Sequence, residues 1–376
     1  MQFFPDSLRC PIDFPLPLRP IGSNLMKAIV YYSHGSPDVL QSAEIEKPVP
    51  GDHEVLMKVR AASVNPLDLG ELKGVPVLFQ IIFGLRKPTV TQPIRPGVDV
   101  AGEVEAVGSK VTQFKPGDDV FGACISDPQA SGAKAWVHRQ GAFAEYVCAA
   151  ESILAIKPGN VTFEQAAAVP VAAFTALQGL RDKGQVQPGH KVLVNGASGG
   201  VGTFAVQIAK AFGAEVTGVC STGNTDLVRS IGADRVIDYT RDDFTKHEDR
   251  YDLIFDCAGN HSLSACRRVL KPGGKCIMVG DMTGRGAGGI LSRLMSALVL
   301  SSFGSQKFIT FLAKPKQADL ALLRDLMHSG KVKPVIDRCY RLTEVPQAIR
   351  YLAEKHARGK VVITLEHTAP SAEPGL

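Results

Sequence analysis

VLVNGASGGVG at residues 192–202, followed directly by TFAVQIAKAFGA, is the stretch that decides the fold of this chain. Its first three residues are typical of a short buried parallel strand, and the glycines lead into an apolar-periodic segment that predicts a helix. The first N–H groups of a helix lack partners within it, so they can bind an anion where no side chain blocks the approach. The pattern therefore predicts a turn that binds the pyrophosphate of a dinucleotide, although close packing of strand and helix would also explain the glycines. The predicted contact residues are Gly196, Ala197, Ser198, Gly199, Gly200, Val201 and Gly202.

The residues that follow this turn predict the rest of a sheet. Four further short apolar segments predict strands, and the segments between them have apolar residues at helical spacing. This alternation is typical of the doubly wound parallel sheet of α/β proteins, the Rossmann fold. The predicted strands are 215–220, 235–238, 251–256 and 274–279, and the predicted helices include 226–231 and 262–270.

The end of the second strand bears on which nicotinamide cofactor fits. NAD-binding turns carry an Asp or Glu there, which holds the ribose 2′-hydroxyl. Here Cys220 is followed by Ser221, Thr222, Gly223 and Asn224, so no carboxylate directly after the strand repels a 2′-phosphate. We therefore expect NADPH, with Ser221, Thr222, Asn224 and Tyr239 as hydrogen-bond donors. A turn that merely caps the next helix is the alternative, and Arg229, the nearest downstream cation, can equally be a solvated helix residue.

Length and composition exclude several classes of protein. The 376 residues, 45% hydrophobic and 21% charged, fit two globular domains. The net charge of +5 is spread without basic runs, so nucleic acid is not expected as a partner. The eight cysteines form no CxxC pair, which argues against a metal knuckle and favours free thiols in a reducing, cytoplasmic compartment.

Both ends of the sequence and two internal segments differ in composition from the rest of the chain. Residues 1–25 are rich in proline and are expected to form a flexible extension, as are residues 367–376. No run of about 18 apolar residues predicts a membrane span. Segments 75–85 and 290–303 are unusually apolar, and we rank pocket lining above a subunit interface and a membrane surface for them.

Three further motifs resemble the medium-chain dehydrogenase/reductase superfamily. They are GVDVAGEVEAVGSKVTQFKPGDDVFG at 97–122, GAFAEY at 141–146 and HARGKVVITL at 356–365. The resemblance implies a GroES-like β-rich catalytic domain over 26–154, completed by 333–366, and a Rossmann domain over 155–332, with the active site between them. Within the superfamily the chain is most similar to the zinc-free quinone oxidoreductases of the reticulon-4-interacting-protein type.

The same resemblance argues against zinc. Where zinc alcohol dehydrogenases carry a ligating Cys, this chain has Asn65, and where they carry a His-Glu pair it has Val98 and Asp99. Asn and Val cannot replace a thiolate or an imidazole, and no cysteine lies between Cys124 and Cys148 to hold a structural zinc. We expect no metal, and hence an electron-poor acceptor such as a quinone or an α,β-unsaturated carbonyl.

Asn65 and Asp68 are the candidate catalytic residues. The carboxamide of Asn65 can donate and accept hydrogen bonds, so it is expected to orient the acceptor and the nicotinamide. Asp68 is a candidate because residues 65–68 match the NPxD motif of the family that the chain resembles. The alternative is structural: Asn65 shapes a turn and Asp68 caps a helix.

The resemblance also implies cofactor contacts outside the glycine turn. Arg358, Gly359 and Lys360 resemble the loop that closes over the cofactor, although either cation can instead be solvated. A thiol at Cys257 can also be inert and buried. The remaining positions that match nicotinamide contacts are Thr175, Cys257, Ala258 and Gly280.

These observations predict an NADPH-dependent, zinc-independent reductase of quinones or enones. An NADPH-dependent aldehyde or ketone reductase, or a non-catalytic NADPH-binding regulatory protein, are the alternatives. The resemblance also implies a homodimer.

Overall fold

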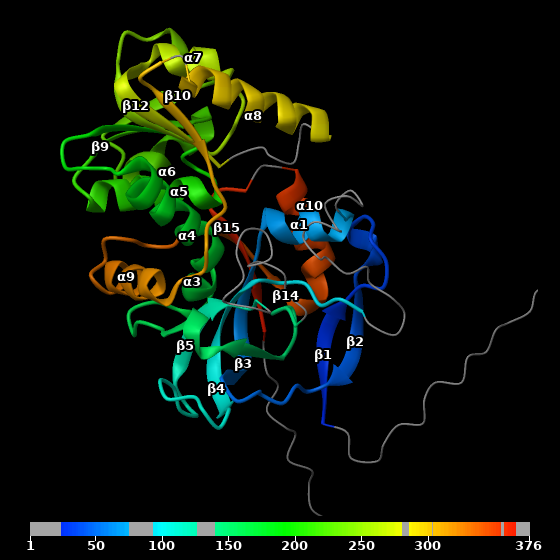
Figure 1. Ribbon diagram of the computed structural model, residues 1–376. Helices are drawn as coiled ribbons and strands as arrows, with labels where there is room; N and C mark the ends of the chain where they lie inside the picture. Colours follow the sequence, from blue (N-terminus) through cyan, green and yellow to red (C-terminus); the bar gives the residue numbers. More distant parts are fainter. Residues whose placement is uncertain are drawn as a thin grey trace, which may run out of the picture.

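The computed structural model describes residues 24–74, 93–125, 140–279, 286–302, 304–354 and 357–365. Two large β-sheets organise them (Figure 1), one in the upper lobe of that view and one in the lower lobe, and a third sheet has only two strands. The two large sheets share no strand, and the last strand along the chain belongs to the lower lobe.

The upper lobe is the expected Rossmann domain. Its six strands pair in parallel in the order β10-β9-β8-β11-β12-β13. Because the order reverses on either side of β8, the carboxyl end of β8 is the switch point where such sheets bind ligands. The strands are β8 (Lys191–Asn195), β9 (Glu215–Cys220), β10 (Arg235–Asp238), β11 (Tyr251–Asp256), β12 (Leu270–Met278) and β13 (Lys307–Thr310).

The strands predicted from the sequence are all present, and two details differ. Strand β12 begins at Leu270 instead of Gly274 because Leu270 already pairs with Tyr251 across a bulge. Edge strand β13 was not predicted, since it is four residues long. The helices of this domain are α4 (Pro170–Gln178), α5 (Gly200–Ala211), α6 (Thr225–Ser230), α7 (Leu263–Arg268), α8 (Gly286–Ser302) and α9 (Gln317–His328).

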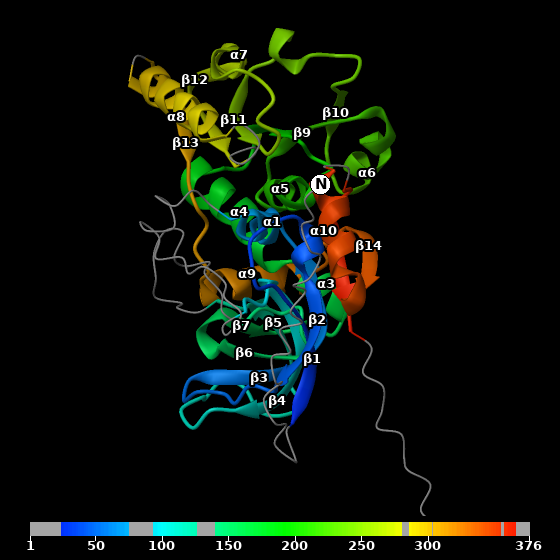
Figure 2. The ribbon, with the colours of Figure 1, turned by 90° about the vertical axis from the view of Figure 1, so that its right-hand side faces the viewer.

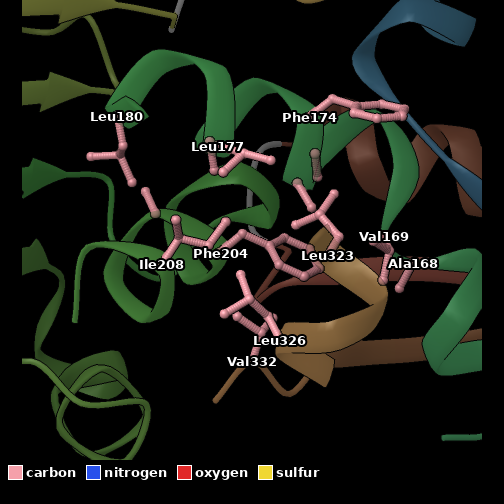
Figure 3. Packing of buried hydrophobic residues seen from close by; sticks show 14 of the residues in the cluster. Ala168, Val169, Phe174, Leu177, Leu180, Phe204, Ile208, Leu323, Leu326 and Val332 are labelled. Carbon is pink, nitrogen blue, oxygen red and sulfur yellow. The ribbon is translucent and has the colours of Figure 1, made fainter. Parts of the chain in front are cut away.

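A continuous apolar core lies between α4, α5 and α9. Figure 3 shows Leu177 of α4 close to Phe204 and Ile208 of α5, with Leu323 and Leu326 of α9 near Phe204. All five residues are buried. Burial of each such side chain contributes about 1.5–3 kcal/mol, so this core holds α5 and the turn that precedes it in place.

The lower lobe is the expected β-rich domain, which has a GroES-like fold. Its strands follow the order β14-β15-β3-β4-β5-β7, with β6 also paired to β3, and β1 and β2 form a separate antiparallel pair. Strand β15 runs antiparallel to β3, so the end of the chain completes this sheet. The strands are β1 (Leu25–Val30), β2 (Gln41–Glu46), β3 (Glu54–Val64), β4 (Asp99–Val107), β5 (Asp119–Ala123), β6 (Tyr146–Ala150), β7 (Leu154–Ile156), β14 (Ile336–Arg341) and β15 (Lys360–Thr364).

Three helices belong to this part of the chain. Helix α10 packs against α1 and β15, and Figure 2 shows it beside β14. Helix α3 contacts β3 and β4. Their bounds are α1 (Pro66–Lys73), α3 (Phe163–Ala167) and α10 (Val345–Ala353).

The structure describes one of the two unusually apolar segments and leaves the other out. Segment 290–303 lies almost wholly in α8, where Met295, Leu298 and Val299 are exposed side by side at helical spacing. Segment 75–85 lies outside the described residues, as do most of the two terminal extensions. No helix in the described part of the chain is long and apolar enough to cross a membrane.

Candidate active site

The glycine turn has the geometry that the sequence predicts. Gly196 adopts a positive φ of 84°, and Gly199 is the N-cap of α5. A Cβ on Gly202 would collide with the carbonyl oxygen of Gly196, so only glycine fits there. At Gly199 the nearest atom to such a Cβ is 3.5 Å away, which leaves the approach to the helix open. The turn therefore combines a tightly packed position with an open face.

This open face fits the pyrophosphate of a dinucleotide. The first N–H groups of α5 have no acceptor within the helix, and the positive end of the helix dipole lies there. Ala197, Ser198, Gly200 and Val201 complete the turn around it. Of these four, only Ala197 is fully buried, because it packs in the domain core.

The residues predicted around a 2′-phosphate gather at the ends of β9 and β10. Tyr239 follows β10, its N–H donates to the carbonyl of Cys220, and its side chain is 54% exposed. The guanidinium Nη2 of Arg358 lies 3.5 Å from the position of a Cβ on Gly223. An exposed cation from the end of the chain is thus placed beside the turn that follows β9.

The polar side chains of this turn do not all have free donors. Asn224 Nδ2 donates to Ser221 Oγ at 3.0 Å and to Ser198 Oγ at 3.2 Å, while its buried Oδ1 has no partner. Because both serines accept from Asn224, their own hydroxyl hydrogens remain available to a ligand. Asn224 therefore orients Ser198 and Ser221, and the prediction that it donates to phosphate directly does not match these bonds.

Thr222 and Arg229 also differ from their predicted roles. Thr222 donates its hydroxyl hydrogen to Asp238 at 2.6 Å, so it has none left for a phosphate. Arg229 pairs with Asp226 within α6 and is a solvated helix residue, as the alternative interpretation held.

Two of the four predicted nicotinamide contacts lie at the carboxyl end of strand β11. Cys257 and Ala258 follow β11 directly, within 3.3–3.6 Å of where a Cβ on Gly196 would lie. Burial raises the pKa of the Cys257 thiol well above its usual value, so this thiol stays protonated and inert. Thr175 lies on α4, where its hydroxyl donates to the carbonyl of Val171. Gly280 lies outside the described residues.

A buried ion pair anchors α8 to the same strand ends. Arg293 of α8 donates from Nη2 to Asp256 Oδ2 at 2.7 Å, and Asn195 Nδ2 donates to the other oxygen of Asp256 at 2.8 Å. Both partners of the ion pair are at most 9% exposed. The exposed apolar face of α8 is thereby tied to the residue that precedes Cys257.

The loop that contains Gly359 and Lys360 rests on the glycine turn. The N–H of Gly359 donates to the carbonyl of Ser198 at 2.9 Å, and Gly359 forms a parallel bridge with Gly199. Gly359 has a φ of 94° and lies too close to the carbonyl of Val335 to carry a Cβ. Lys360 follows it, and its side chain passes Gly200. The loop thus joins the cofactor turn to the β-rich sheet.

Lys360 ends in a buried polar network that includes Asn65. Its ammonium donates to Asn65 Oδ1 at 2.6 Å and forms an ion pair with Asp99 at 3.2 Å. Asn65 Nδ2 donates to Asp99 Oδ2 at 2.9 Å, as does Ser63 Oγ at 2.7 Å. Lys360 is 4% exposed, so the alternative to a cofactor contact, a solvated cation, is wrong.

Asp99 is the centre of this network and was not predicted as a site residue. Its Oδ1 accepts from the N–H of Val171 at the start of α4, so the carboxylate also joins the two domains. A carboxylate within the apolar segment VDVAG was the signal that could have identified it, since a buried charge requires partners. Ser63 carried no comparable signal, because a serine in a strand is ordinary.

Asp68 has a structural role, as the alternative held. Its Oδ2 accepts from the N–H of Asn65 at 2.7 Å, and its Oδ1 accepts from the N–H of Gly97 at 3.1 Å. The first bond closes the capping box of α1. Asp68 therefore fixes the backbone of Asn65.

The residues at the positions of zinc ligands do not fit zinc. Val98 is fully buried in the apolar core. The carboxylate of Asp99 already accepts from four donors, and an amide at Asn65 is a poor substitute for thiolate. No group of three or more metal-binding side chains occurs within the described ranges.

Comparison with known proteins identifies the family. A model of the alcohol dehydrogenase GroES-like domain matches residues 51–159, and a model described as zinc-binding dehydrogenase matches residues 231–363. The 2-methylene-furan-3-one reductase of Solanum lycopersicum is 36% identical over 344 residues, which cover 90% of this chain and 79% of that protein. The quinone oxidoreductase of Homo sapiens is 33% identical over 356 residues, which cover 92% and 99%.

A solved structure supports the same assignment. The quinone oxidoreductase from Coxiella burnetii has a TM-score of 0.76 and 29% identity, with 91% of this chain and 100% of that chain covered. The chain belongs to the medium-chain dehydrogenase/reductase superfamily. Its relatives there include quinone oxidoreductases and an NADPH-dependent alkenal/one oxidoreductase, and the protein is an oxidoreductase enzyme.

Proposed function

We propose that this enzyme uses NADPH to reduce a quinone or an α,β-unsaturated ketone without zinc. The observation that carries the proposal is the buried network of Asn65, Asp99 and Lys360, which touches the glycine turn through Gly359. When bound, NADPH supplies a hydride. An electron-poor acceptor takes a hydride without a Lewis acid, and the protein then needs only hydrogen-bond donors for the negative charge that develops on oxygen.

The preference for NADPH rests on the turn after β9. Arg358 is placed beside Gly223, and the hydroxyls of Ser198 and Ser221 keep their hydrogens free. Asp238 lies in the same region, but its carboxylate is held by Thr222 and Thr240. An arginine and two hydroxyls suit a 2′-phosphate better than a bare 2′-hydroxyl.

Zinc independence rests on the donor set, with Asn65, Val98 and Asp99 at the ligand positions. The acceptor class rests on the same chemistry and on the names of the relatives, which include a quinone oxidoreductase and an alkenal/one oxidoreductase. Without a metal to polarise a simple carbonyl, aldehydes and saturated ketones are expected to be poor substrates.

The test is consumption of NADPH by the purified full chain. We expect turnover with 9,10-phenanthrenequinone and with an enone, slower turnover with NADH, and little with a saturated aldehyde. A chelator is expected to leave these rates unchanged. Loss of activity on chelation with recovery on adding zinc would contradict zinc independence, and binding of NADPH with no turnover of any acceptor would contradict the reductase.

We also propose a homodimer and a cytoplasmic location. Strand β13 pairs with β12 on one side and forms the edge of the Rossmann sheet, which favours pairing with a second copy. The described cysteines are all free, as expected in a reducing compartment. Sedimentation of the purified chain and microscopy of a tagged chain test the two proposals.

A further inference from the structure

Lys360 is a charged side chain in an unusual place. Lysines are almost never fully buried unless they are paired, and Lys360 is 4% exposed. Its partners are Asn65 Oδ1 at 2.6 Å and Asp99 Oδ2 at 3.2 Å. The chain thus keeps an ammonium group inside the candidate active site, with its counter-charge beside it.

The hydrogen-bond donors of this network can be counted. Asn65 has two amide hydrogens, and they point to Asp99 Oδ2 at 2.9 Å and to the carbonyl of Ser63 at 3.3 Å. The hydroxyl hydrogen of Ser63 is also used, on Asp99. Asn65 therefore has no donor left for an acceptor molecule, although its carboxamide was the predicted contact.

Lys360 is different because an ammonium has three hydrogens. Two of them meet Asn65 and Asp99, and within the described part of the chain the third meets no acceptor. Since Asp99 already accepts from four donors, the network has no further acceptor to offer on that residue. The spare donor and the positive charge of the network both reside on Lys360.

We propose that Lys360, held in place by Asn65 and Asp99, is the catalytic residue that donates a hydrogen bond to the acceptor oxygen. This inference rests on the proposed function. In an enone, hydride adds to the β-carbon, the C=C electron pair shifts, and the carbonyl oxygen becomes an enolate. Lys360 stabilises that negative charge and passes it a proton, giving an enol that becomes the ketone. The neutral amine then takes a proton from water.

The backbone places Lys360 before any substrate arrives. Gly359 is bonded to Ser198 and bridged to Gly199, while the N–H of Lys360 donates to the carbonyl of Val335. The side chain then packs across Gly200, with Cδ 3.2 Å from the position of a Cβ there. A donor fixed in advance requires no reorganisation during the reaction, which is the condition under which such groups accelerate it most.

A purely structural role is the competing explanation, because Lys360 also joins the two domains. Lys157 provides a matched control. It is a lysine 8% exposed, its ammonium lies 3.5 Å from Asp119, and it donates to the carbonyls of Pro158 and Val161. Lys157→Met removes a buried lysine of equal length from the β-rich domain without touching the glycine turn.

The experiment compares Lys360→Met, Lys360→Arg, Asn65→Ala and Lys157→Met. For each we measure kcat and KM with 9,10-phenanthrenequinone and with an enone, NADPH affinity by fluorescence, and the urea unfolding midpoint. Loss of one preorganised donor lowers kcat by about 100- to 1000-fold. We expect this loss in Lys360→Met with NADPH affinity within about threefold of wild type, and at least tenfold recovery in Lys360→Arg. Lys157→Met should keep wild-type kcat.

Asn65→Ala keeps the test decisive if Lys360→Met does not fold. Under the proposal Asn65→Ala retains the donor, so its kcat falls less than that of Lys360→Met and of Lys360→Arg. A kcat of Lys360→Met within threefold of wild type, or a greater loss in Asn65→Ala than in Lys360→Arg, would overturn the role of Lys360 alone. An inactive wild-type enzyme that still binds NADPH would instead overturn the proposed function.

Discussion

The proposed site has two halves, one for the cofactor and one for the acceptor, and they are built from different chemical groups. The cofactor half consists of backbone: a glycine turn from Gly196 to Gly202, the first turn of α5, and the backbone of Gly359. The acceptor half consists of buried side chains, with Asp99 and Lys360 as its charges. A site made of backbone tolerates almost no added volume, whereas a site made of charges tolerates almost no change of charge.

This difference predicts which changes damage each half. Substitutions that add atoms should act on the glycine turn, and substitutions that remove a charge should act on the network around Asp99. Changes of pH should act on buried titratable side chains elsewhere, because the backbone groups of the glycine turn do not titrate.

Asp99→Asn is expected to have the largest effect on stability. It leaves the buried Lys360 ammonium without its counter-charge, and breaking a buried pair in this way costs about 3–5 kcal/mol. Urea denaturation measures the free energy of unfolding. Asp119→Asn is the control, because Asp119 is 43% exposed and its pair with Lys157 should contribute less than about 1 kcal/mol. Equal losses of stability in the two variants would contradict the proposal that the buried pair contributes more than the exposed pair.

Gly202→Ala should lower the free energy of unfolding by about 3 kcal/mol, the upper end of the range for overpacking. Its new Cβ would collide with the carbonyl oxygen of Gly196, which is backbone and cannot rotate away. Gly199→Ala is the matched control: its Cβ meets nothing closer than 3.5 Å, so stability should change little. NADPH affinity measured by fluorescence should nevertheless fall in Gly199→Ala, and unchanged affinity would show that the open face does not bind the cofactor.

Helix α1, which begins directly after Asn65, should also make stability depend on pH. Burial raises the pKa of Glu71 on α1 from 4.5 to about 8, so between these values the folded chain holds a proton that the unfolded chain has released. Stability then falls as pH rises, by roughly 2 kcal/mol between about pH 6 and pH 8. Denaturation across this range should show the slope, and Glu71→Gln should remove it. The slope should survive in Glu44→Gln, on exposed strand β2; if Glu71→Gln keeps it too, another group is responsible.

Arg358→Gln is expected to have the smallest effect. Removing the cation beside Gly223 should weaken NADPH about tenfold relative to NADH, or about 1.4 kcal/mol. The ratio of kcat/KM values for the two cofactors measures the change. Arg229→Gln, which removes a solvated cation of α6, should leave the ratio unaltered. A similar shift in both variants would indicate a general effect of surface charge.

The same comparison explains what could be predicted from the sequence. The glycine turn is local: its strand, its glycines and its helix are contiguous, so residues 192–214 predict the turn, and the strands that follow predict the sheet. The contact of Gly359 with the turn is not local. Strand β12 was also predicted, except for its start, because its extra pairing crosses a bulge that no local pattern shows. The short edge strand β13 carried too few residues to form a pattern.

The acceptor half could be predicted only in part. Asn65 and Lys360 are 295 positions apart, and nothing in either local sequence indicates that they meet. The roles of Thr222 and Asn224 depended on Asp238, Ser198 and Ser221, whose distances from them are set by the sheet. Polar side chains could be identified as candidates, but how their hydrogens are shared is decided by the folded structure.

The parallel bridge between Gly199 and Gly359 has a consequence for biosynthesis. Because β15 pairs with β3 while the loop before it rests on the glycine turn, a growing polypeptide that has reached α9 still lacks one wall of its site. Domains fold during translation mostly from the N-terminus onward. The site of this enzyme is complete only after the segment from α9 to β15 has been made, so chains that stop before β15 are expected to be inactive.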